Sequence, residues 1–341
     1  MVLEEIKEKI EKAHKVALFW HEHADWDALG SMLWFWSVLE KLGKEVYYFT
    51  PDHPSRVFDF LGVEWKISCE FDYWEYDLLM FLDFSQYSRI PVFAFWHEDY
   101  FDKKEKVIID HHKLEKTPDN ALVYCDSESI SNCILLYEIV REWWKDLLDE
   151  NIATYFFMGL ATDSWNFRYD EWEQSVRSFR IAAELLELGA KKKLVIDEIF
   201  RSKSYRSVQF MQMVLQRMQK IKLTLGNRDI NIIYSFYDEE ELEKYWIDHD
   251  EADYGLHVMQ DIRNDDLVVL LKKCGIFINW SLRWRWDIDC SELAKLFWWG
   301  GHINAAWYKI QSCWYIEKDV KDMMEAIKKA LNGNYQKLLI W

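Results

Sequence analysis

Short apolar runs alternate with longer amphipathic segments along the first half of the chain. Residues 16–20, 78–82 and 107–109 are uninterrupted apolar runs, as the buried strands of a parallel sheet usually are. Between them, residues 28–42 and 130–145 carry apolar residues at helical spacing. Strands that alternate with helices predict an α/β fold with a doubly wound parallel sheet.

The rest of the pattern predicts a second, smaller domain. In the first half, further helices are expected at 2–14, 150–161 and 171–189, with a strand at 45–50. The second half predicts helices at 206–222, 291–297 and 317–331 and strands at 229–236, 267–271 and 276–282. This mixture indicates a mixed α/β domain at 206–341, joined to a catalytic domain at 1–189 by a linker at 190–205 that is rich in charge.

Acidic and imidazole side chains follow the apolar runs. His21, Asp25 and Asp27 follow the first run, Asp83 the second, Asp110-His111-His112 the third, and Asp163 a fourth run at 156–160. Read as strand ends, these positions meet at one edge, because ligands of a parallel sheet bind outside the carboxyl ends of its strands. A set of oxygen and imidazole donors there predicts a site for divalent metal ions.

Charge and cysteine content narrow the classes of function. The formal net charge is −17, which opposes non-specific binding to long nucleic acid. Six scattered cysteines form no Cys-x-x-Cys pair, so a zinc knuckle is not expected. The charged amphipathic start and the lack of a long uncharged run predict a cytoplasmic protein without a membrane segment.

The motifs in their order resemble those of the DHH phosphoesterases. The stretch from His21 to Ser31 resembles the first motif of that family, and Asp83 with Arg89 resembles the second. Asp110-His111-His112 matches the motif that names the family, and residues 159–164 with Arg168 resemble the fourth. Ser281-Leu282-Arg283 and the stretch 300–306 resemble the associated DHHA1 domain, so the likeness covers nearly the whole chain.

The resemblance implies a two-metal site and a set of substrate contacts. It implies two Mn²⁺ ions, with Mg²⁺ as the alternative metal. His21 and Asp25 would hold one ion, Asp27, His111 and Asp163 would hold the other, and Asp83 would bridge both. Asp83 and His112 are the expected catalytic residues, His112 as a ligand-orienting or phosphate-contacting group, and Asp110 is expected to fix a histidine tautomer. The expected substrate-binding residues are Arg89, Ser131, Arg168, Arg283, Gly300, Gly301 and His302.

These expectations combine into a metal-dependent hydrolase. The predicted activity is Mn²⁺-dependent cleavage of short oligonucleotides or linear dinucleotides such as pApA to nucleoside 5′-monophosphates, with pAp phosphatase activity as an addition. No long duplex and no membrane are expected as partners, and family analogy suggests a homodimer. Pyrophosphate hydrolysis and processive exonuclease action are the alternatives within the family. Neither fits an acidic chain of 341 residues well.

Tryptophan stands where the family usually has glycine. The chain has 20 Trp and 11 Gly, and the family places glycine at or near Trp26, Trp165, Trp286, Trp298-Trp299 and Trp307. Glycine serves positive φ or close backbone approach, and tryptophan supplies neither. The rings then either stack on bases or crowd the loops and impair turnover, which leaves a nucleotide-binding protein of the same fold as a further alternative.

Overall fold

The computed structural model describes most of the chain, and its two compact units span Met1–Ser202 and Lys203–Trp341. The described residues are 2–20, 26–50, 60–61, 67–71, 75–84, 98–112, 117–118, 120–168, 172–225, 228–263, 266–284, 290–295, 305–311 and 316–338. Within these ranges no helix is both long and apolar enough to cross a membrane.

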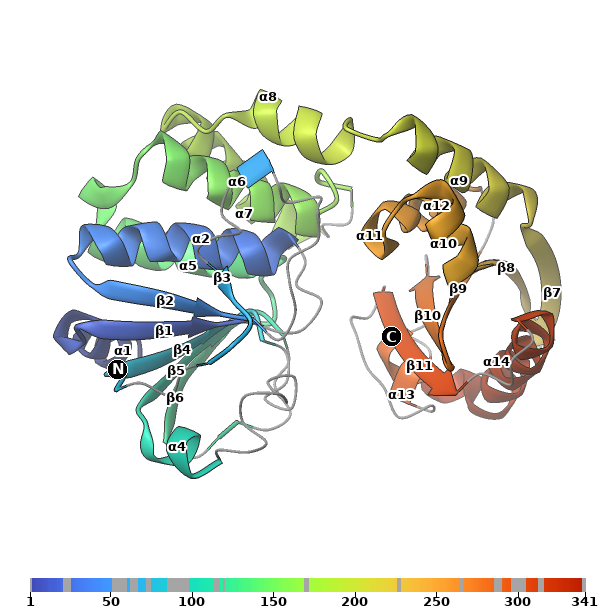
Figure 1. Ribbon diagram of the computed structural model, residues 1–341, viewed down its shortest axis with the longest axis horizontal. Helices are drawn as coiled ribbons and strands as arrows, with labels where there is room; N and C mark the ends of the chain where they lie inside the picture. The colour runs from blue at the N-terminus through green and yellow to red at the C-terminus, as the bar shows by residue number, and fades with distance from the viewer. Residues whose placement is uncertain are drawn as a thin grey trace. The chain divides into compact units, whose positions relative to one another are not determined.

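A parallel sheet forms the centre of the first unit (Figure 1). Its strands in the described ranges are β1 (Lys15–Phe19), β2 (Glu45–Phe49), β3 (Ile67–Ser68), β4 (Leu78–Leu82), β5 (Lys106–Asp110) and β6 (Ala121–Cys125). Their order is β3-β2-β1-β4-β5-β6, and every neighbouring pair is parallel. The prediction of a doubly wound α/β fold is therefore confirmed.

Helices cover the sheet because its strands are apolar on both sides. The helices of this unit are α1 (Val2–Lys12), α2 (Trp26–Lys41), α4 (Glu98–Lys103), α5 (Asn132–Trp143), α6 (Glu150–Asp163), α7 (Trp172–Glu187) and α8 (Lys192–Val195), with short turns η4 (Lys145–Leu147) and η5 (Ile196–Phe200). Leu18, Met80 and Ile109 point into a core shared with α1, α2, α5 and α6. Phe19 and Phe81 point to the opposite face, into an aromatic cluster that includes Phe101 of α4.

Gly30 allows α2 to cross α6 at short range. A methyl group at this position would lie 3.3 Å from Cys133 Sγ, from the backbone nitrogen of Gly159 and from the carbonyl oxygen of Tyr155. That separation is tighter than ordinary van der Waals contact, so a side chain here would force the two helices apart. The glycine of the first motif therefore has a packing role, and it fixes the helix that begins next to the expected metal ligands.

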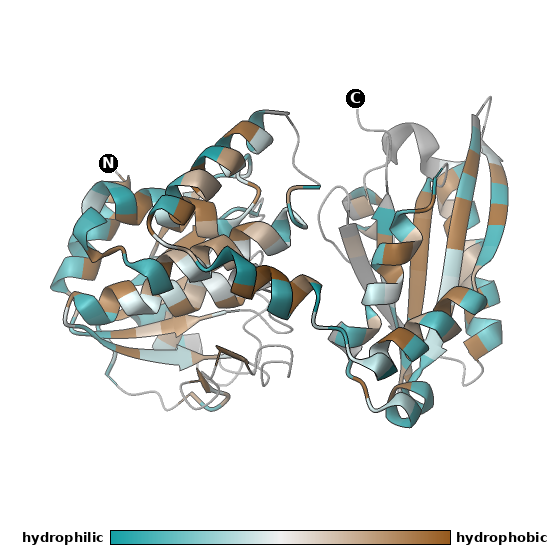
Figure 2. Cartoon of the chain, turned by 90° about the horizontal axis from the view of Figure 1, so that it is seen from above, coloured by the Kyte–Doolittle hydropathy of each residue, from teal (hydrophilic) through white to brown (hydrophobic). Residues whose placement is uncertain are grey.

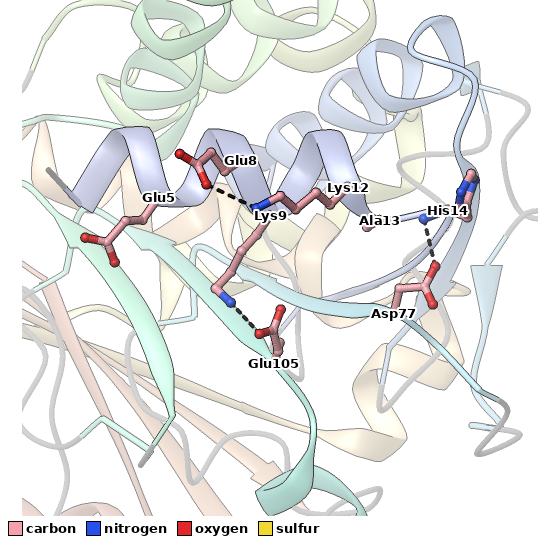
Figure 3. A pocket seen from close by; sticks show the side chains of 8 residues that line it. All are labelled: Glu5, Glu8, Lys9, Lys12, Ala13, His14, Asp77 and Glu105. Atoms are coloured by element: carbon pink, nitrogen blue, oxygen red, sulfur yellow. Dashed lines mark hydrogen bonds and ion pairs between the residues drawn. The ribbon is translucent and has the colours of Figure 1, made fainter.

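Asp77 anchors the edge of the sheet where the strands begin. Its carboxylate accepts hydrogen bonds from the backbone nitrogens of His14 (2.7 Å) and Lys15 (2.9 Å), which ties the start of β4 to the start of β1 (Figure 3). A surface groove of about 460 Å³ lies at this edge, lined by Glu5, Glu8, Lys9, Lys12, Ala13, His14, Asp77 and Glu105. It is therefore at the end of the sheet opposite the carboxyl ends of the strands, where the predicted chemistry lies.

The second unit contains a mixed sheet. Its described strands are β7 (Gln219–Leu225), β8 (Arg228–Asp238), β9 (Leu267–Cys274), β10 (Phe277–Trp284) and β11 (Ala305–Gln311), in the order β11-β10-β9-β8-β7. Only β8 and β9 pair in parallel within this set, and the other neighbours are antiparallel. The predicted mixed α/β character of this part of the chain is confirmed.

Two groups of helices pack on this second sheet. They are α9 (Tyr205–Gln216), α10 (Glu239–Tyr245), α11 (His249–Ala252) and α12 (Tyr254–Gln260) around one apolar cluster, and α13 (Cys290–Lys295) and α14 (Ile316–Leu338) around the other. In Figure 2 brown residues run along inner strands, an outer strand of the second unit alternates brown with teal, and many helix residues on the outer surfaces are teal. The helix expected at 206–222 is shorter than predicted, because residues 219–225 form the edge strand β7 instead.

Candidate metal centre

Two neighbouring strands of the first unit bring the central acidic and histidine residues together. Asp83 directly follows β4, and His111 and His112 directly follow β5, which pairs with β4. The backbone nitrogen of Asp83 donates to the carbonyl oxygen of Ile109 (3.1 Å), so the pairing continues to the end of both strands. Asp83 then takes a left-handed conformation with φ of 54°, which aspartate tolerates better than most residues.

Three donor groups converge on one point at this edge. His111 Nε2 lies 3.3 Å from Asp83 Oδ1 and 3.6 Å from Asp163 Oδ2. His112 Nδ1 also lies 3.3 Å from Asp83 Oδ1. Asp83 is 1 % exposed, and its Oδ1 lies within 3.3 Å of a ring nitrogen of each histidine. Asp83, His111 and His112 are grouped closely enough to hold a metal ion.

The tautomer of His111 follows from its other hydrogen bond. His111 Nδ1 lies 3.2 Å from the carbonyl oxygen of Ser129, and a carbonyl can only accept, so Nδ1 carries the proton. Nε2 faces two carboxylates, so the space between them suits a positive charge. A proton on Nε2 supplies that charge and stabilises ionised Asp83, and a metal ion would supply it in place of the proton, with the Nε2 lone pair as a ligand.

His112 is held by a different partner. Asp110 is fully buried, and its Oδ1 accepts hydrogen bonds from the backbone nitrogen and from Nδ1 of His112, both at 2.8 Å. Burial lowers the pKa of His112, but its hydrogen bonds to Asp110 and Asp83 outweigh that effect and raise the pKa to about 10. The ring is therefore a cation at neutral pH, with an orientation that Asp110 fixes.

The same two histidines keep Asp83 ionised. Burial alone would raise the pKa of Asp83, but the adjacent rings of His111 and His112 outweigh burial and hold the pKa well below its usual range. A carboxylate that stays charged while almost fully buried is an oxygen ligand ready for a hard divalent cation. The residues present thus fit a metal ion in charge and in donor type.

The spacing of the donors fits as well. Oxygen and nitrogen atoms around a hard octahedral cation at about 2.1 Å lie about 3 Å from one another. The separations of 3.3 and 3.6 Å around His111 Nε2 are close to that value. His111 and Asp83 would share an ion with Asp163 at these positions, which is the grouping that the resemblance implies apart from Asp27.

Asp163 reaches the site from a helix end. The apolar run 156–160 lies within α6, so the helix expected at 150–161 is confirmed and the reading of this run as a fourth strand end is wrong. Asp149 caps that helix at its start by accepting from the backbone nitrogens of Asn151 and Ile152, and the segment continues as helix up to Asp163. The donor set therefore combines two strand ends with one helix end.

An unusual turn follows Asp163. Trp165, Asn166 and Phe167 all have positive φ, at 48°, 58° and 62°. The turn is held by hydrogen bonds from the backbone of Trp165 to the carbonyl oxygen of Thr162 (2.9 Å) and from the backbone of Arg168 to that of Ser164 (2.8 Å). It leaves Arg168 exposed one turn beyond the carboxylate of Asp163.

Sequence reasoning missed the residues that support this edge. Ser129 provides the carbonyl that orients His111, and Phe84 donates its backbone N–H to Asp110 Oδ2 at 2.7 Å. In the amide orientation that satisfies both neighbours, Asn132 donates to the carbonyl of Ile109 and accepts from the backbone N–H of Asp83, each at 3.2 Å. The polar run 129–132 just before α5 is the signal that could have identified two of the three.

The remaining predicted residues divide into described and undescribed ones. Ser131 is fully buried and caps α5, accepting from the backbone of Ile134 at 3.4 Å, so it has a structural task. Arg283 lies on β10 of the second unit, half-buried. Asp27 belongs to the first turn of α2, of which only the backbone is described. His21, Asp25, Arg89, Gly300, Gly301 and His302 lie outside the described residues.

Comparison with known proteins gives the same family as the motifs. Residues 15–160 match the family described as "DHH family, N-terminal domain". The chain is 24% identical over 322 residues to the bifunctional oligoribonuclease and PAP phosphatase NrnA of Thermus thermophilus, covering 91% of this chain and 88% of that protein.

Solved structures share the fold. An exopolyphosphatase-related protein from Bacteroides fragilis superimposes with a TM-score of 0.81 at 22% identity, and the match covers 96% of each chain. RecJ from Thermus thermophilus, solved in complex with Mn²⁺, matches with a TM-score of 0.50 at 15% identity over 99% of this chain and 54% of RecJ. At these identities the likeness concerns the fold alone.

The fold, the aspartate–histidine site and these similarities define the chain as a phosphoesterase, a class of hydrolase. Within that class, residues 15–160 match the N-terminal domain of the DHH family, as the ordered motifs in this part of the chain predict.

Proposed function

We propose that this phosphoesterase is a Mn²⁺-dependent phosphodiesterase that cleaves short oligonucleotides or linear dinucleotides such as pApA to nucleoside 5′-monophosphates. Removal of the 3′-phosphate from pAp is a further activity of the same site. Support comes from the Thermus thermophilus relative, whose name combines oligoribonuclease and PAP phosphatase and whose similarity spans 91% of this chain. The net charge of −17 supports a small substrate over a long duplex.

The observation that carries the proposal is the position of His111 Nε2. It faces Asp83 at 3.3 Å and Asp163 at 3.6 Å, while its Nδ1 proton is used by Ser129. Two Mn²⁺ ions, or Mg²⁺ ions, would be held here by His21, Asp25, Asp27, Asp83, His111 and Asp163. When bound, such ions supply Lewis-acid stabilisation of phosphoryl oxygens and an activated water.

The chain's own residues would orient the phosphoester. His112, a cation locked by Asp110, is placed to contact a non-bridging phosphate oxygen and so to orient the phosphorus with its leaving oxygen opposite the attacking group. Arg168 is exposed near Asp163 and can pair with a second phosphate oxygen. Arg89 completes the proposed contacts of the first domain, whereas Ser131, predicted as a further contact, is fully buried and caps α5.

The second domain would bind the rest of the substrate. We take residues 1–189 as the catalytic domain, 190–205 as the linker and 206–341 as the substrate-binding domain. Arg283 on β10, together with Gly300, Gly301 and His302, is the proposed anchor for the distal phosphate or base. The protein is proposed to work in the cytoplasm, and a homodimer is the proposed assembly.

A hydrolysis assay tests this function. The full chain is incubated with pApA and MnCl₂, and AMP is measured for the wild-type protein, for Asp83→Asn and for the control Asp149→Asn. Asp149 lies at the N-cap of α6, where asparagine caps as well as aspartate. AMP release by the wild-type protein and the control, but not by Asp83→Asn, is the expected result. If the wild-type protein and both variants bind pApA and none of them releases AMP, the chain is instead a nucleotide-binding protein.

A further inference from the structure

The balance of tryptophan and glycine in this chain is inverted. At an ordinary glycine usage of about 7%, a chain of 341 residues would carry about 24 glycines, but it has 11. It has 20 tryptophans, and several stand where the DHH motifs have glycine. The backbone gives an independent check, because only some positions in a fold require glycine.

Trp246 lies at a glycine position by its backbone. It follows the last residue of α10 with φ of 58° and ψ of 46°, and its N–H donates to the carbonyls of Glu243 and Leu242 (Figure 1). Helices commonly end on a left-handed residue that makes such bonds, and that residue is usually glycine. The indole is 77 % exposed, so no burial compensates for the left-handed backbone.

Trp165 is a second tryptophan of this kind. Its φ is 48°, in the turn that follows Asp163. The other described non-glycine residues with positive φ are Asp83, Asn120, Asn166 and Phe167. Aspartate and asparagine reach this region readily, whereas bulky side chains are outliers there. The DHH resemblance places a glycine near this position.

Two buried tryptophans show strain of a different sort. Trp20 and Trp34 are 1 % and 0 % exposed, and the indole N–H of each finds no hydrogen-bond partner in the described parts of the chain. A buried tryptophan N–H usually has a partner. The rings of Trp34 and Phe156 have centroids 3.7 Å apart, closer than the usual 4.5–7 Å between aromatic side chains. The site of Trp34 is therefore tight for an indole.

We propose that Trp165 and Trp246 stand at glycine sites, and that the cell that makes this protein inserts glycine there. The codon UGA explains the substitution, since some genetic codes read it as tryptophan and others read it as glycine. The same reading would turn Trp298-Trp299-Gly300-Gly301 into four consecutive glycines and Asp25-Trp26-Asp27 into Asp-Gly-Asp. Glycine-rich loops of that kind let backbone N–H groups approach a phosphate.

The rival explanation is that these indoles are functional platforms for bases. It requires tryptophan in the mature protein at the positions where the backbone is left-handed. The proposal requires glycine there. The two explanations therefore predict different amino acids at these positions of the mature protein. Neither prediction depends on whether the protein hydrolyses any nucleotide.

Peptide mass spectrometry on protein purified from its own cells decides between them. We expect UGA at codons 165 and 246 of the gene, and peptides whose masses correspond to glycine at both positions. UGG codons, or peptides that carry tryptophan at positions 165 and 246, would overturn the proposal. The measurement needs no ligand and no activity.

A stability comparison tests the backbone argument separately. Trp246→Gly is compared with Trp143→Gly, because Trp143 ends α5 without positive φ. We expect the Trp246→Gly variant to unfold about 2–4 °C higher than the parent chain, and Trp143→Gly to unfold at a lower temperature. A fall in the unfolding midpoint of Trp246→Gly similar to that of the control would show that position 246 is not a glycine site.

Discussion

The substitution Asp110→Asn tests whether Asp110 orients His112, because it leaves His112 and the proposed metal ligands unchanged. Asp110 is fully buried and accepts three hydrogen bonds, from Phe84 N at 2.7 Å and from His112 N and Nδ1 at 2.8 Å each. Asparagine has nearly the same shape, but one of its two terminal atoms is a donor. The change therefore alters hydrogen bonding and charge with little change in packing.

The magnitude follows from counting donors. If the new amide nitrogen faces Phe84, it points at one backbone N–H, and one hydrogen bond is replaced by two donors that face each other. If it faces His112, it points at two N–H groups, and two hydrogen bonds are lost in this way. One buried donor without an acceptor costs about 1–3 kcal/mol, which sets the expected loss in the free energy of unfolding. Loss of a residue that orients a metal-site histidine typically costs about 10–100-fold in metal affinity or activity.

The assays are urea unfolding, Mn²⁺ titration by calorimetry and AMP release from pApA. Asp149→Asn provides the matched control, because it makes the same chemical change at a helix N-cap outside the site. We expect Asp110→Asn to lose stability and rate while it still binds Mn²⁺, because His112 is not one of the proposed metal ligands, and we expect the control to keep its affinity and rate. An unchanged rate in a destabilised Asp110→Asn variant would refute the orienting role of Asp110.

Three further predictions follow from the described contacts. Gly30→Ala should lower the free energy of unfolding, measured with urea, by about 1–3 kcal/mol, because the new methyl group meets three atoms of α5 and α6 at 3.3 Å. Gly333→Ala is the control, because a methyl group there lies in open space on α14, and it should raise the free energy of unfolding by about 0.5–1 kcal/mol. Backbone N–H groups of Lys15 and His14 hold the pKa of Asp77 below its usual value, so its contribution to stability is present above the unfolded pKa of about 3.9 and is lost as the pH falls through the folded pKa. The gap in urea midpoint between wild type and Asp77→Asn should therefore be open near neutral pH and close in acid, and a gap that widens in acid would contradict this. Chelation with EDTA should abolish AMP release and added Mn²⁺ should restore it, and activity that persists after exhaustive chelation would rule out a metal-dependent reaction.

The sheet of the first unit was predictable because its strands are unmixed apolar runs. Residues 78–82 and 107–109 are buried on both faces, so their sequences contain no polar position to confuse the pattern. The edge strand β6 at Ala121–Cys125 was missed, since it is only half-buried and its five residues show neither clear alternation nor a buried run. Edge strands depend on pairing partners that the local sequence does not specify.

The second unit was harder to read for the same reason. Residues 219–225 alternate lysine with apolar residues directly after α9, and this pattern was taken as a continuation of the helix. The strand β11 at Ala305–Gln311 was not predicted at all, although it pairs with β10 along its whole length. In both cases an antiparallel partner decides the conformation: β8, which begins three residues after β7 ends, and β10 for β11.

The site was predictable in its residue types and less so in its geometry. Asp83 and His111 follow neighbouring strands, so their meeting could be inferred from parallel topology alone. The helix that ends at Asp163 was expected at 150–161, but its approach to His111 and the supporting roles of Ser129 and Asn132 could not be inferred, because they depend on how α5 and α6 pack on the sheet. Hydrogen bonds to backbone groups carry no residue-type signature in a single sequence.

The central claim is tested most directly by crystals of the full chain soaked in MnCl₂ and measured at the manganese absorption edge. We expect an anomalous peak within coordination distance of Asp83, His111 and Asp163, with a second peak close by that shares Asp83. An anomalous map without a peak between these three side chains, under saturating manganese, would contradict it.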